Sequence, residues 1–131
     1  MFKKILSLVL AVAMIATLCV SMASCNNFDD DFKLGVILLH DEASTYDKNF
    51  LEAVERAADQ LGLSEDQVIY KKNIPESNAC YEAAADLVDE GCDIIFADSF
   101  GHETYLIQAA EEFPDVEFCH ATGTQARTFH T

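Results

Sequence analysis

Two short stretches of this 131-residue sequence combine an aromatic residue with polar or small neighbours, just after an apolar run. The residues concerned are Tyr46 and Asp47 in the first stretch, and Ser99, Phe100, Gly101 and His102 in the second. An aromatic side chain in such a turn can offer a flat face to a planar ligand, or it can pack beneath its own loop. The residues alone leave both interpretations open, and two aromatics on one edge would favour ligand binding.

Signals for catalysis are weak throughout the sequence. The five glycines stand apart from one another, so there is no phosphate-binding loop, and no Gly-x-Ser-x-Gly motif marks a nucleophile. His40 and His102 could approach each other, but no acid–histidine spacing supports a metal site. We therefore expect a protein that is not an enzyme, with no cofactor and no bound metal.

Acidic residues raise one enzyme-like alternative. Asp41, Glu42 and Asp98 follow predicted strands, where phosphoacceptor receiver domains hold a magnesium ion. The lysine that completes such a site follows a fifth strand, which this sequence does not reach. Carboxylates at strand ends also commonly cap helices or face water, so we set the receiver interpretation aside.

Apolar runs alternate with helical periodicity from residue 33 onward. The pattern predicts strands at 33–39, 67–71, 93–97 and 116–121, and helices at 45–61, 77–90 and 103–113. Thr45 is expected to cap the first helix and Gly62 to end it. The side chains expected to point inward are Phe50, Leu51, Val54, Ala58 and Leu61 in the first helix, Cys80, Ala83, Ala84, Leu87 and Val88 in the second, and Leu106, Ile107, Ala110 and Phe113 in the third.

This alternation predicts an α/β fold, a doubly wound parallel sheet of about four strands flanked by helices. Such sheets bind ligands beyond the carboxyl ends of their strands. The segments 40–46, 73–76, 98–102 and 121–124 should therefore meet on one rim. We expect Tyr46 and Phe100 to lie on that rim.

The N-terminus has the layout of a bacterial secretory signal. Two lysines precede a long apolar run, and Met22-Ala23-Ser24-Cys25 resembles a lipobox, with methionine in place of the usual branched residue. We expect a lipoprotein signal peptide at 1–24, a lipid on Cys25, a tether over 25–32 and an incomplete lobe over 33–131. The lipid would anchor an exported protein to the outer face of the bacterial cell membrane. A retained membrane anchor is the alternative.

The charge balance excludes some partners. The sequence holds 23 acidic and 8 basic residues, a formal charge of −15. Loss of residues 1–24 removes Lys3 and Lys4, which leaves 6 basic residues against 23 acidic ones and a charge of −17. A chain this acidic is not expected to bind nucleic acid.

The cysteines do not form a recognisable framework. Of the five, Cys19 lies in the signal and Cys25 is the lipid site, which leaves Cys80, Cys92 and Cys119. An odd number without Cys-x-x-Cys spacing predicts neither disulfides nor zinc. We expect all three to be buried thiols.

Two segments carry a resemblance to a known family. "KLGVILLHDEASTYDKNFLEAVERAADQLGL" and "CDIIFADSFGHETYLIQAAEEFPDVEFCHATG" resemble the basic membrane protein (BMP) family, the substrate-binding lipoproteins of ABC transporters. The most specific elements are the Phe-Ala-x-Ser-Phe-Gly turn and the segment "EFPDVEFCHATG". The resemblance covers residues 33 to about 124.

The resemblance implies a type I periplasmic-binding-protein fold with two lobes, of which this chain holds part of the N-terminal one. Several family members bind purine or other nucleosides, with an aromatic residue stacked on the base. By position, Tyr46 and Asp47 match the aromatic-then-polar pair of the family, in which the second residue is often asparagine. Ser99, Phe100 and Gly101 match its ligand-side turn, with His102 beside them.

The resemblance also implies a small-molecule ligand and an ABC permease as partners. Family members are more than twice as long, so we expect a lone lobe to bind nucleosides weakly or not at all. Two alternatives stay open. The chain could belong to a type I sugar-binding receptor, or to a membrane-anchored sensor or interaction lobe that takes no part in transport.

Overall fold

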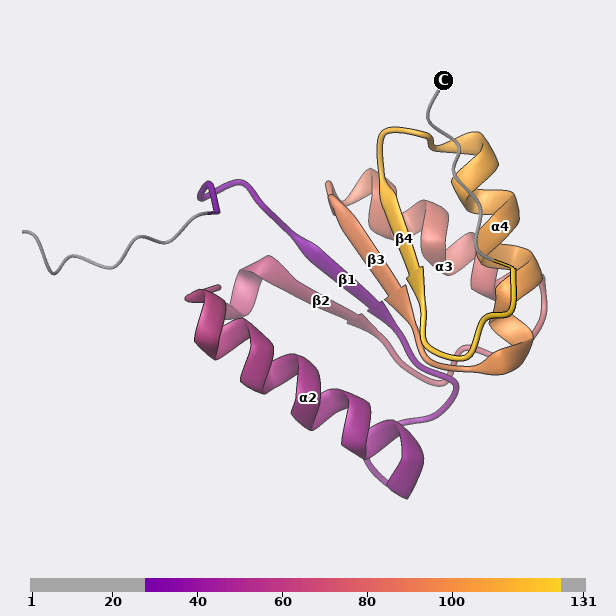
Figure 1. Ribbon diagram of the computed structural model, residues 1–131, viewed down its shortest axis with the longest axis horizontal. Helices are drawn as coiled ribbons and strands as arrows, with labels where there is room; N and C mark the ends of the chain where they lie inside the picture. Colours follow the sequence, from indigo (N-terminus) through magenta and orange to yellow (C-terminus); the bar gives the residue numbers. More distant parts are fainter. Residues whose placement is uncertain (1–27, 126–131) are drawn as a thin grey trace, which may run out of the picture.

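The computed structural model describes residues 28–125. The predicted signal segment, Cys25 and residues 126–131 lie outside the described residues. The helices and strands are β1 (Leu34–Ile37), α2 (Thr45–Leu61), β2 (Val68–Lys71), α3 (Asn78–Asp89), β3 (Ile94–Ala97), α4 (Glu103–Glu112) and β4 (Glu117–His120), with short 3-10 turns at Glu65–Gln67 and Phe100–His102 (Figure 1). Within residues 28–125, no helix is both long and apolar enough to cross a bilayer.

The four strands form one parallel sheet in the order β2-β1-β3-β4. Helix α2 lies across the sheet from α3 and α4, so helices cover both faces (Figure 1). The predicted α/β class, the parallel doubly wound sheet and its four strands are confirmed.

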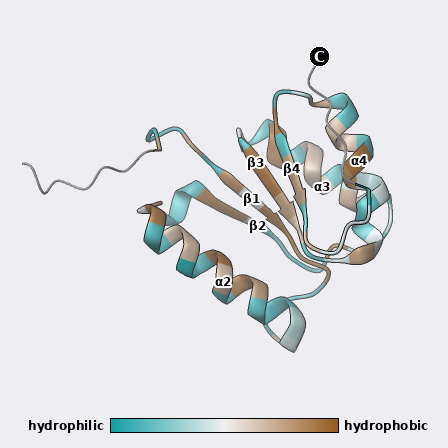
Figure 2. Ribbon diagram, viewed as in Figure 1, coloured by the Kyte–Doolittle hydropathy of each residue, from teal (hydrophilic) through white to brown (hydrophobic). Residues whose placement is uncertain are grey.

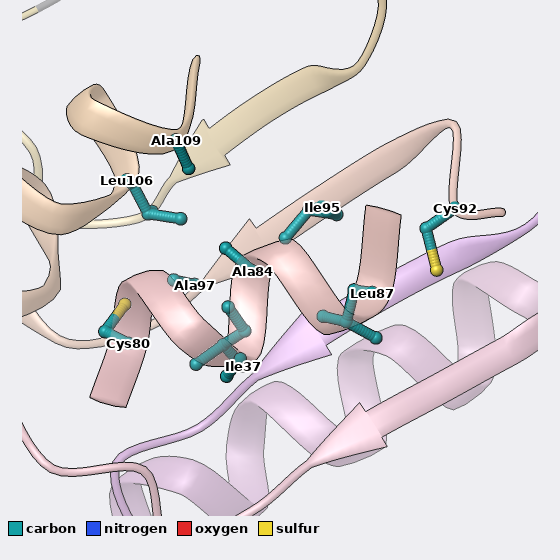
Figure 3. Packing of buried hydrophobic residues seen from close by; sticks show 10 residues of the cluster. Ile37, Cys80, Ala84, Leu87, Cys92, Ile95, Ala97, Leu106 and Ala109 are labelled. Carbon is teal, nitrogen blue, oxygen red and sulfur yellow. The ribbon is translucent and has the colours of Figure 1, made fainter. Parts of the chain in front are cut away.

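The core has two layers because alternate residues of each strand point to opposite faces. On the α3 and α4 side, Ile37, Leu87 and Ile95 are fully buried (Figure 3). On the α2 side, Val36 and Leu38 pack with Leu51 of the helix. The hydropathy colouring shows the same pattern, with apolar residues concentrated along the strands (Figure 2).

Helix α2 spans Thr45–Leu61 as predicted, but its N-cap lies one residue earlier than predicted. Ser44, and not Thr45, is the N-cap, and its hydroxyl accepts a hydrogen bond from the Asp47 N–H. Thr45 is already helical, so the predicted cap was wrong by one position. Gly62 ends the helix in the left-handed conformation with φ of 72°, as predicted.

Two predicted core residues are exposed. Leu61 is 42% exposed, because the 17-residue helix α2 is about 25 Å long and overhangs strands of four residues, which reach about 13 Å. Cys119 is exposed as well. It pairs with Phe96 of β3 and so lies on the face of the sheet that α2 covers, but its strand β4 is at the edge of the sheet, beyond the residues that pack under α2. Cys80 and Cys92 are buried as predicted, and burial raises their thiol pKa values to about 12 and about 11.

Candidate functional site

The segments at the carboxyl ends of the strands meet as expected and form the rim of the sheet, residues 38–47, 73–76, 98–103 and 120–125. The Tyr46 hydroxyl donates a hydrogen bond to the Asp98 carbonyl at 3.0 Å. The Leu39 N–H donates to the Asp98 carboxylate at 3.2 Å. His120 of β4 lies with Nε2 2.5 Å from the Ser99 carbonyl. These bonds tie the loops after β1, β3 and β4 together.

Two aromatic side chains stand out from this rim. Phe100 is 64% exposed and Tyr46 is 48% exposed. The Tyr46 ring packs on one side against Phe50, with the ring centroids 5.0 Å apart, and its hydroxyl bond fixes its direction. Phe100 is not packed beneath its own loop. The rim therefore presents two aromatic faces near the end of β3.

The Phe100 turn is built around Glu76, a residue that the sequence analysis did not single out. One carboxylate oxygen of Glu76, Oε1, accepts the Ser99 hydroxyl at 2.5 Å and the Gly101 N–H at 2.8 Å. These hydrogen bonds lower the pKa of Glu76. Because both donors on either side of Phe100 turn towards Glu76, the ring between them is directed outward.

Gly101 is needed for close approach and not for an unusual backbone angle. Its φ is not positive, in contrast to Gly62 and Gly91. A Cβ atom at position 101 would lie 2.4 Å from Cδ of Glu76. The turn can close over the carboxylate only if residue 101 has no side chain.

Gly101→Ala should therefore lower the free energy of unfolding by about 1–3 kcal/mol, the usual cost of overpacking. Glu76→Ala removes the two nearest atoms, Cδ and Oε1, and leaves only Cβ at 2.8 Å. The double variant Glu76→Ala/Gly101→Ala should therefore lose less than the two single losses added together. Urea unfolding of the four proteins measures this coupling. Additive losses would show that Glu76 does not determine the need for glycine.

Asp47 is buried, with 1% of its surface exposed. Its carboxylate accepts the His40 N–H at 2.7 Å and the Ser44 hydroxyl at 2.5 Å, and the His40 ring lies 3.3 Å away. Burial alone would raise the pKa of Asp47, but these hydrogen bonds outweigh it and the pKa is lowered. In this structure Asp47 braces the loop between β1 and α2 and is not open to a ligand.

Asp98 is fully buried next to Asp47. Burial, with the charge of Asp47 added to it, raises the pKa of Asp98 to about 7. Its Oδ2 atom is buried and accepts no hydrogen bond. An ionised Oδ2 would be buried without a donor and beside a second carboxylate, so the neutral form of Asp98 is favoured up to about neutral pH.

His102 and Ser99 lie beneath the rim surface. His102 is 0% exposed, its Nε2 is 2.9 Å from the Ile74 carbonyl, and burial lowers its pKa. Because a carbonyl can only accept, Nε2 carries the proton. His102 thus joins the loops before α3 and α4, and the expected ligand contact does not fit its burial. Ser99 is 7% exposed, and its hydroxyl donates a hydrogen bond to Glu76.

Glu103 is a second rim residue that the sequence analysis missed. Its carboxylate accepts the N–H groups of Thr124 and Gln125, and these bonds lower its pKa. No local spacing signals this role, because the partners are more than twenty residues away in sequence. Glu103 fixes the segment after β4 against the start of α4.

A cavity of about 430 Å³ lies elsewhere, at the far end of α2, lined in part by Glu55, Ala58, Leu63 and Tyr70. It contains none of the predicted site residues. Among residues 28–125 no group of three or more His, Cys, Asp or Glu side chains could hold a metal ion. We regard the rim as the candidate site, because exposed aromatics and buried carboxyl groups converge there.

No family model and no curated protein matches the sequence. The solved structures that share its fold include the following two. A solute-binding protein of an ABC transporter system from Conexibacter woesei matches with a TM-score of 0.58 and 19% identity, over 66% of this chain and 28% of that protein. A transcriptional activator of the comK gene from Bacillus halodurans matches with a TM-score of 0.57 and 19% identity, over 67% of this chain and 29% of that protein. The chain spans less than a third of either protein, and at this identity the likeness establishes the fold alone.

Proposed function

We propose that this chain is part of a solute receptor that serves an ABC importer, and that it is not an enzyme. The observation that carries the proposal is the pair of exposed aromatics, Tyr46 and Phe100, at the carboxyl end of a parallel sheet. Ligands of such sheets bind at this end. The fold shared with an ABC solute-binding protein and the resemblance to the BMP family support the same role.

A nucleoside is the proposed ligand, because a flat base suits an aromatic face. In this proposal Phe100 stacks on the base and Tyr46 borders it. The chain is exported and held at the outer face of the bacterial membrane by a lipid on Cys25. An ABC permease is the proposed partner in the membrane.

A sensor without transport is the second candidate. The specific observation in its favour is the second solved structure, a transcriptional activator that shares the fold to the same degree. Genes for a permease and an ATPase beside the coding sequence would support import. A neighbouring kinase or regulator would support sensing.

The test of ligand binding is an NMR shift titration of the mature chain with millimolar adenosine, guanosine and inosine. We expect millimolar affinity, because one lobe contacts a ligand from one side and closure requires two lobes. Base stacking contributes about 1–3 kcal/mol, so Phe100→Ala should abolish most of the shifts.

Leu61→Ala is the matched control, because Leu61 is also an exposed apolar side chain but lies at the far end of α2. It should bind like the wild type. Equal binding by Phe100→Ala and wild type would remove Phe100 from the site. Micromolar affinity of the wild type would contradict the need for a second lobe.

A further inference from the structure

Several backbone N–H groups of the rim already donate to carboxylates of the chain itself. The N–H groups of Leu39 and His40 bind the carboxylates of Asp98 and Asp47. Ala43 N–H binds Asp41, at 3.0 Å. The pattern continues at the loops after β3 and β4, where Gly101 N–H binds Glu76 and the Thr124 and Gln125 N–H groups bind Glu103.

This arrangement reduces the number of free donors on the rim. An anionic ligand group, such as a phosphate, usually binds to free backbone N–H groups at the start of a helix. Here these six N–H groups already face internal carboxylates. A phosphate bound to any of them would have to displace a carboxylate and would meet its charge.

The rim also lacks a free cation among the described residues. Lys72, which lies beside it, is bound to Glu42 at 3.0 Å. The His40 ring lies against Asp47 at 3.3 Å. The net charge near the rim is therefore negative.

Glu76 is the carboxylate that binds both sequence neighbours of Phe100. Its Oε1 accepts both hydrogen bonds of the turn, from Ser99 and Gly101. Within the described part of the chain, no hydrogen bond to Oε2 is found, and Glu76 is exposed. One oxygen thus fixes the turn, and the other is available as an acceptor to a ligand.

We infer that the rim selects ring-bearing solutes that bring hydrogen-bond donors and carry no negative charge, and that Glu76 sets this selectivity. The inference rests on the proposed function and specifies its ligand class. Hydroxyl or amino groups of the solute donate to Glu76 while the ring stacks on Phe100. Phosphorylated forms of the same solute are rejected.

The experiment is an NMR titration of the mature chain with adenosine and with adenosine 5′-monophosphate, following the amide signals of Phe100 and Gly101. The wild type should bind adenosine at least tenfold more tightly than the monophosphate. Glu76→Gln should keep the turn, because its amide oxygen can accept the same two hydrogen bonds. It should reduce the preference for adenosine at least threefold.

Glu55→Gln is the matched control, because it removes the same charge from α2 at the cavity far from the rim. It should leave the preference unchanged. Equal affinity of the wild type for both compounds would overturn the inference while leaving the proposed function intact. An equal effect of the two variants would overturn the role of Glu76. Absence of shifts with either compound would contradict both the inference and the proposed function.

Discussion

Replacing Leu87 with alanine is expected to lower the free energy of unfolding by about 2–5 kcal/mol. Leu87 is fully buried in α3 and packs in the cluster that joins α3 and α4 to the sheet. A Cβ atom at Gly35 would lie only 2.9 Å from its Cδ1 atom, so helix and strand are in close contact here. The truncation leaves a cavity that this tight packing cannot fill.

The control is Leu61→Ala, which makes the same change at the exposed end of α2. It should cost less than about 1 kcal/mol, because little apolar surface is lost from the core. Urea unfolding followed by circular dichroism compares the two variants directly. Equal losses of stability in the two variants would show that Leu61 is buried, and would contradict the finding that this end of α2 extends beyond the sheet.

Asp98→Asn is expected to remove a pH dependence that the wild type shows between about pH 4 and pH 7. Because its pKa is raised to about 7, Asp98 keeps its proton up to about that pH in the folded chain, whereas in the unfolded chain it loses the proton at the ordinary pKa of 3.8. In this range the folded state binds more protons, so its stability falls as the pH rises, by at most about 1.4 kcal/mol per pH unit. Below pH 4 both states are protonated and the effect vanishes.

Asparagine resembles the protonated acid, since its oxygen can accept the Leu39 N–H and its amide carries no charge beside Asp47. The variant should therefore be more stable than the wild type at pH 8, by about 1 kcal/mol or more. The measurement is urea unfolding at pH 4, 6 and 8, with the exposed Asp59→Asn as control. A difference between variant and wild type that is constant with pH would mean that Asp98 is ionised throughout.

Patterns that report local burial are sufficient to predict most of this fold. The apolar runs at Leu34–Ile37 and Ile94–Ala97 and the three- and four-residue spacing in α2 give strands and helices in the right order. Leu61 and Cys119 have the same apolar character, but their burial depends on which helix lies over which strand. No local pattern contains that information, so both were predicted in the core and are exposed.

The site is less predictable than the fold because its contacts join residues distant in sequence. The topology rule places Tyr46 and Phe100 on one rim. It does not reveal that Glu76 holds the Phe100 turn from more than twenty residues away. Nor does it reveal that Asp47 is buried against His40 or that His102 is bound to Ile74 beneath the surface. Side-chain direction at these positions follows from tertiary packing.

The central claim is that the rim with Tyr46 and Phe100 is where the chain meets its solute. Intermolecular nuclear Overhauser effects between adenosine and the isotope-labelled mature chain test it most directly. The account predicts contacts from the base protons to the ring protons of Phe100 and Tyr46. Contacts to Leu63 and Tyr70 in the cavity at the far end of α2, with none to Phe100, would contradict it.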